Sequence, residues 1–115
     1  MIALALVLAV AGASPGPSGQ RREERFQELL RTYPGRPPAE TFRQVAALID
    51  EGPFASRDRA EYWLGSANLA AGDRAAARAW FSRLLREHAA SPWGERSLLG
   101  LGEVAEQEHR YSAAL

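Results

Sequence analysis

The sequence predicts an all-α fold in which antiparallel helical hairpins repeat along the chain as a short α-solenoid. Apolar side chains recur every three to four residues, and no stretch alternates with period two for long enough to form a strand. Two segments also resemble each other: Leu64-Gly65 and Leu101-Gly102 lie 37 residues apart. A fixed period of about 20–50 residues is typical of stacked supersecondary units.

Composition excludes several classes of function. The 115 residues suffice for one modest domain, and 14 basic residues balance 14 acidic ones. A net charge of zero gives no general attraction to nucleic acid or to an anionic membrane surface. Because the chain has no cysteine, it forms no disulfide and no thiolate metal site.

The N-terminal segment is predicted to lie outside the fold. Ile2–Ala11 is an unbroken apolar run, too short to span a bilayer, and Ala11-Gly12-Ala13 has the small-x-small form of a cleavage site. Residues 1–13 are therefore expected to be a signal peptide, with a retained anchor through residues 2–13 as the alternative. Residues 14–20 are rich in Pro, Gly and Ser and are expected to be a linker.

Residues 21–55 are predicted to form an irregular helical hairpin. The first helix carries Phe26, Leu29 and Leu30 on one face and ends at Pro34-Gly35. The second helix begins near Pro37-Pro38, since proline fits the first helical turn, and ends before Gly52-Pro53. Its apolar face consists of Phe42, Val45, Ala46 and Ile49.

Residues 56–115 are predicted to contain three further helices. Ser56 is expected to cap the first helix, Gly72 to end it and Asp73 to cap the second. The third is expected to begin at Ser91-Pro92. The inward faces are predicted to comprise Ala76, Ala77, Trp80, Phe81, Leu84 and Leu85 on the second helix, and Leu98, Leu101, Gly102 and Ala105 on the third.

These residues resemble the tetratricopeptide repeat (TPR). Leu64, Gly65, Gly72, Ala77 and Phe81 match its helix A, turn and helix B positions, and the next unit matches at Leu101, Gly102, Tyr111 and Ala114. The resemblance implies a right-handed TPR-like solenoid whose second repeat is truncated, with a turn near Tyr111. The longer period and the Tyr-Trp-Leu-Gly segment are similar to TPR proteins of the bacterial envelope, namely outer-membrane-assembly lipoproteins and the Tol-Pal coordinator. An exported, periplasmic or envelope-associated protein is therefore expected.

The resemblance also implies a binding surface on the concave face, lined by helix A side chains. These side chains combine an aromatic anchor, guanidinium groups and carboxylates, which suits a peptide or helix from a protein partner. Because the repeat ends without a polar cap, the chain is expected to be part of a longer reading frame, or to bury that end in an oligomer or against a partner. The predicted partner-binding residues are Arg59, Tyr62, Ser66, Leu69, Arg96, Leu99, Glu103 and Glu106.

No motif predicts catalysis, a cofactor, a metal site or a small-molecule substrate. His88 and His109 are 21 residues apart, which matches no metal-ligand spacing, and each is expected at a solvated helix end or turn. Glu103 and Glu106 are expected on a solvated helix face. The tryptophans are expected in the core, although for Trp93 an exposed position is as compatible with the sequence. The resulting prediction is a non-enzymatic interaction scaffold, and the alternatives are a helical accessory domain of a longer envelope enzyme or a membrane-anchored spacer.

Overall fold

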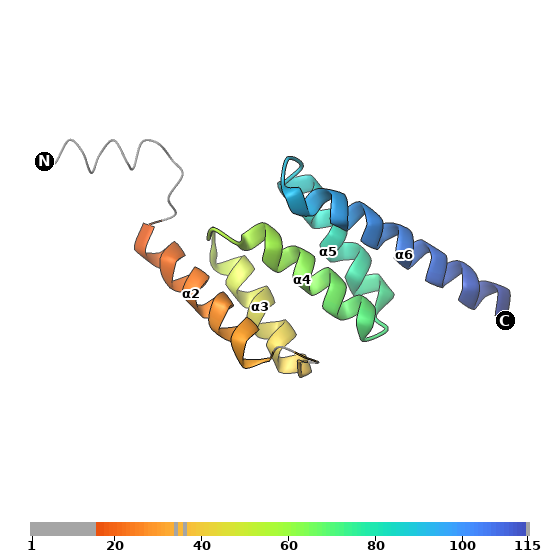
Figure 1. The fold of residues 1–115 in the computed structure, drawn as a ribbon, viewed down its shortest axis with the longest axis horizontal. Coiled ribbons are helices and arrows are strands. Elements are labelled where there is room, and N and C mark those ends of the chain that lie inside the picture. The colour runs from red at the N-terminus through yellow and green to blue at the C-terminus, as the bar shows by residue number, and fades with distance from the viewer. Residues whose placement is uncertain (1–15, 34, 36, 115) are drawn as a thin grey trace, which may run out of the picture. The chain divides into compact units, whose positions relative to one another are not determined.

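The computed structural model describes residues 16–33, 35 and 37–114, and the described chain is all-helical (Figure 1). The predicted signal peptide or anchor lies outside these residues. The chain divides into two compact units, one ending at Arg57 and the other beginning at Asp58. The helices are α2 (Gly16–Thr32), α3 (Ala39–Glu51), α4 (Arg57–Ala70), α5 (Arg74–Glu87) and α6 (Pro92–Ala114).

The first unit packs α2 against α3 around a small aromatic and aliphatic core. The rings of Phe26 and Phe54 lie 5.9 Å apart, and both residues are buried. Two side chains of α2 form hydrogen bonds with the segment that follows α3. Arg22 donates from Nε and Nη2 to the carbonyl oxygen of Pro53, and Glu23 accepts from the backbone N–H and the hydroxyl of Ser56.

Two local expectations for this region need correction. Helix α2 begins at Gly16, so residues 16–20 of the predicted linker are helical, and Pro17 occupies the first turn, where proline is tolerated. The Ser56 hydroxyl does not cap α4 as expected: it donates to Glu23 Oε2 at 2.7 Å, and the N–H of Arg59, which a capping serine would bind, donates to Asp58 Oδ1 at 2.8 Å. The start of α3 after Pro38 and its end at Gly52 are confirmed.

In the second unit, α4 and α5 form an antiparallel hairpin closed by a three-residue turn (Figure 1). The predicted turn chemistry is confirmed: Gly72 has a φ of +88°, and Asp73 Oδ1 accepts from the N–H of Ala76. Ser91 starts α6 by accepting from the N–H of Trp93, and its own hydroxyl donates to Asp58 Oδ2 at 2.6 Å.

The core of this unit is centred on Phe81 of α5, which is 1% exposed. Its ring lies between Gly65 of α4 and Gly100 of α6, where an added Cβ would come closer than 3.0 Å to ring atoms. Ala77 and Val104 complete the buried cluster. The absence of side chains at the two glycines thus lets both neighbouring helices approach the same aromatic ring.

Helix α6 differs from its prediction in two ways. It continues through Tyr111 to Ala114, so the turn expected near Tyr111 is not formed. Its inward face is also displaced by about one residue. The buried residues are Gly94, Ser97 and Val104, whereas Leu98, Gly102 and Ala105 are exposed. In the described part of the chain, no helix combines the length with the apolarity that crossing a membrane requires.

Candidate functional site

An open groove of about 620 Å³ runs between α4 and α6. Phe81 of α5 contributes to its lining, and the other lining residues come from the two outer helices. The groove holds six of the eight predicted partner-binding residues: Tyr62, Ser66, Leu69, Arg96, Leu99 and Glu103. Helix spacing explains this gathering, since residues three and four apart share a face and the two helices flank the same ring of α5.

One end of the groove carries a cluster of aromatic rings and guanidinium groups. The ring of Trp93 lies 5.1 Å from that of Tyr62, which is in turn 5.9 Å from Phe81. The guanidinium carbons of Arg59 and Arg96 lie 5.8 Å and 4.9 Å from the centre of the Trp93 ring, within the range of cation–π attraction. Both arginines are exposed, and their guanidinium groups lie beside a half-buried tryptophan.

The two remaining predicted residues are placed differently. Arg59 reaches the aromatic cluster through Trp93 but does not line the groove. Glu106 points elsewhere on α6, where it forms an exposed ion pair with Arg110 at 2.5 Å. The structure thus brings seven of the eight residues to the groove or its aromatic end, and leaves Glu106 outside.

The sequence prediction omitted Trp93 and Gln107. Trp93 lies one helical turn before Arg96, and Gln107 lies one turn after Glu103 and donates to its Oε1 at 3.2 Å. Both belong to the face of α6 that already contained predicted residues, so the three- to four-residue spacing was the available signal. For Trp93 the structure gives an intermediate position: the residue is half-buried.

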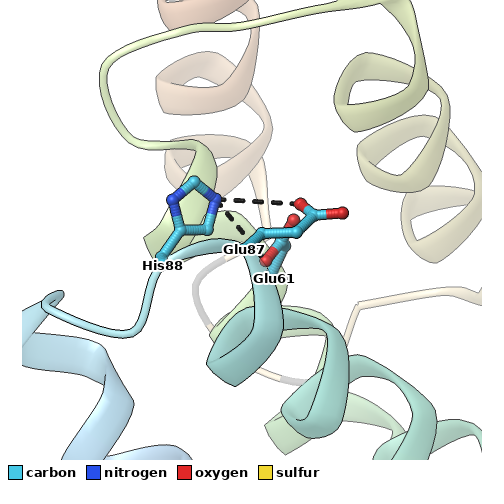
Figure 2. Close-up of side chains that lie close together, drawn as sticks. All are labelled: Glu61, Glu87 and His88. Carbon is cyan, nitrogen blue, oxygen red and sulfur yellow. Dashed lines mark ion pairs between the residues drawn. The ribbon is translucent and has the colours of Figure 1, made fainter.

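A second cluster of polar side chains lies at the C-terminal end of α5 and involves Glu61 of α4 (Figure 2). His88 Nε2 lies 3.7 Å from Glu61 Oε1 and 3.8 Å from Glu87 Oε1. The Glu61 side chain is 0% exposed, whereas those of Glu87 and His88 are 31% and 28% exposed. The expectation that His88 lies at a solvated helix end is thus wrong for its Nε2 atom, which is buried.

The sequence contained one signal for this second cluster. Glu61 shares the buried face of α4 with Leu64, Gly65 and Asn68, so a carboxylate occupies a position with core spacing. A fully buried carboxylate is rare without a compensating partner.

No protein-family model, curated protein or solved structure matches the chain.

Proposed function

We propose that this chain is a non-enzymatic, TPR-like interaction scaffold of the bacterial envelope that binds an extended peptide or a helix in the groove between α4 and α6. The observation that carries the proposal is the groove itself, where an aromatic cluster with two arginines adjoins an apolar strip. Tryptophan, tyrosine and arginine are the residues most often responsible for binding energy at protein interfaces.

The TPR-like assignment is supported by the packing of the second unit. A short turn with a left-handed glycine joins α4 to α5, and small residues let helices approach Phe81 closely. The long, continuous α6 departs from a strict repeat. The proposed envelope location is supported by the apolar, signal-like sequence of residues 2–13 and by the Tyr-Trp-Leu-Gly segment of the first repeat.

The groove chemistry suggests the character of the bound segment. Leu69 and Leu99 offer apolar surface to a hydrophobic side chain. Arg59 and Arg96 present guanidinium groups that suit a carboxylate, because the planar fork donates two parallel hydrogen bonds. Glu103 lies further along α6 and suits a basic group. We therefore expect a ligand with an apolar anchor near an acidic residue.

The proposal can be tested with a peptide that is selected from a random library for binding to the full chain, by measuring its affinity for variants of the groove. The double variant Tyr62→Ala/Arg96→Ala removes one aromatic and one guanidinium group from the groove, so Kd is expected to rise at least about 30-fold while far-UV circular dichroism is unchanged. Fluorescence polarisation of the labelled peptide measures the affinity.

The matched control is Glu106→Ala/Arg110→Ala, which removes an exposed pair of opposite charges from the same helix outside the groove. Its affinity for the peptide should stay within about twofold of the original chain, since exposed ion pairs contribute little. Unchanged affinity in the groove variant, or an equal loss in both variants, would show that the peptide binds elsewhere and would reject the proposed function.

A further inference from the structure

The cluster of Glu61, Glu87 and His88 has the composition of a metal site. Each residue offers one ligand atom, and these atoms all lie within 4.8 Å of one another. Figure 2 shows the imidazole ring of His88 turned toward both carboxylates. From this geometry we propose that the three side chains bind a first-row divalent transition-metal cation, with Zn²⁺ as the best match.

The spacing of the ligand atoms favours a bridging cation over hydrogen bonds. The separations of 3.7 Å and 3.8 Å from His88 Nε2 to the two carboxylates exceed the usual hydrogen-bond range of about 2.7–3.2 Å. Ligands bound to Zn²⁺ at about 2.1 Å in tetrahedral geometry are separated by ~3.4 Å. The two separations from His88 Nε2 exceed this value by a few tenths of an ångström, and all three atoms, which lie within 4.8 Å of one another, draw together when they coordinate the ion.

His88 Nε2 supplies an independent indication. This nitrogen is buried, and no hydrogen-bond partner lies within reach of it in the part of the chain that the structure describes. A buried polar atom of this kind calls for a partner such as an ion. The ring is also held in place, because the backbone N–H of His88 closes α5 by donating to Leu84 O at 2.7 Å.

Arg83 positions both carboxylates from the opposite side. Its Nε lies 2.8 Å from Glu87 Oε2 and 3.7 Å from Glu61 Oε2, so each carboxylate directs one oxygen to Arg83 and the other to His88. Groups that hold the ligands of a metal in this way raise its affinity. With a neutral imidazole the four side chains carry a net charge of minus one, which favours a cation.

The choice among cations follows from the ligand types. Imidazole suits zinc and its transition-metal neighbours, whereas Mg²⁺ and Ca²⁺ prefer oxygen ligands alone. Zinc sites with three protein ligands complete their coordination with water. The partial exposure of Glu87 and His88 leaves that fourth position accessible to solvent.

Titration of the full chain with Zn²⁺ tests the site. Competition with a chromophoric chelator is expected to give one saturable site, and ¹⁵N spectra of the imidazoles should show His88 Nε2 shifting on saturation. His88→Gln and Glu87→Gln should each weaken the affinity at least about tenfold, since each removes a ligand. Mg²⁺ should not compete at equal concentration.

His109→Gln is the matched control, because the chain has two histidines, each preceded by a glutamate, and His109 is exposed. This variant should bind zinc as the original chain does. Arg83→Lys tests the positioning role, because it keeps the positive charge and removes the planar guanidinium group: it should weaken zinc affinity while leaving the His88 nitrogen shift in place.

If His88→Gln or Glu87→Gln is unstable, Glu61→Gln judged by the same ¹⁵N shift provides the second measurement. An internal ion network without a metal predicts no saturable zinc binding and no shift of His88, and either result overturns the proposal. Equal zinc binding by the His88 and His109 variants also overturns it. The peptide affinity of the groove is measured without zinc, so failure of one proposal leaves the other standing.

Discussion

At the scale of the residue, Phe81 determines which glycine of α6 must remain a glycine. A Cβ on Gly100 would come closer than 3.0 Å to the Phe81 ring, whereas a Cβ on Gly102 would meet nothing within 4 Å. The ring cannot move aside, since Gly65 approaches it on α4 in the same way. Gly100 and Gly102 therefore provide a matched pair for substitution on the same helix.

Gly100→Ala is expected to lower the free energy of unfolding by about 1–3 kcal/mol, because overpacking outweighs the gain in helix propensity. Gly102→Ala is expected to raise it by about 0.5–1 kcal/mol, because alanine restricts the unfolded chain and nothing is crowded. Urea unfolding followed by circular dichroism measures both. Equal effects would mean that the Phe81 contact does not limit this position.

The same two glycines explain why the sequence analysis placed Gly102, instead of Gly100, on the inward face of α6. Leu99-Gly100 and Leu101-Gly102 are both Leu-Gly pairs, so a repeat search can align either of them with Leu64-Gly65. The alignment on Gly102 gives a period of 37, but the glycine that contacts Phe81 lies 35 residues after Gly65. Local spacing could not distinguish the two, because the choice depends on a ring contributed by another helix.

At the scale of the element, the contact between α5 and α6 includes an ion pair between Arg78 and Glu108. The hydrogen bond from Arg78 is the main cause that holds the pKa of Glu108 below its ordinary value, with the charges of Arg78 and Arg74 adding to it. A carboxylate whose pKa is depressed by folding stabilises the fold above its unfolded pKa. That contribution is lost as the pH falls through the folded value.

A double-mutant cycle with Arg78→Gln and Glu108→Gln is therefore expected to give a small favourable coupling at pH 7 that declines as the pH falls below the ordinary glutamate pKa of about 4.3 and Glu108 becomes protonated. Both side chains are nearly half exposed, so the coupling should also weaken in 1 M salt. Urea unfolding of the four proteins at each pH provides the measurement. A coupling that persists in acid would contradict this assignment of the ion pair.

Helix ends with their own turn chemistry were the most predictable elements. Gly72, Asp73 and Ser91 act within a few residues of the backbone groups they satisfy, so the sequence alone identifies them. Ser56 was mispredicted because its hydroxyl donates to Glu23, 33 residues away, while the N–H of Arg59 that it was expected to bind donates to Asp58. The start of α2 was missed because a segment rich in Pro, Gly and Ser carries no apolar period.

At the scale of the whole molecule, most of the groove residues were predictable from the sequence, but the cluster of Glu61, Glu87 and His88 was not. The groove residues lie on helix faces whose spacing can be read directly, and the hairpin brings those faces together. Glu61 and His88 are 27 residues apart, and their approach depends on how α4 and α5 pack side by side. Spacing rules for metal ligands within one helix therefore could not detect this pair.

The balanced charge of the whole chain leads to a further prediction about its behaviour in solution. With 14 basic and 14 acidic residues and an isoelectric point near 6.7, electrostatic repulsion between copies is smallest around neutral pH. Leu98, Leu99 and Tyr111 are exposed and add apolar surface to α6. Self-association measured by light scattering should therefore peak near pH 7 and decline toward pH 9.

Leu98→Gln should reduce this association at pH 7, because Leu98 is 59% exposed and does not line the groove. Its effect on the free energy of unfolding should stay within about 0.5 kcal/mol, as for most surface substitutions. Ala105→Gln is the control, since it changes an exposed residue about two turns further along α6 without removing a large apolar side chain. Scattering that is independent of pH, or that the two substitutions reduce equally, would mean that neither the charge balance nor the exposed leucine controls association between copies.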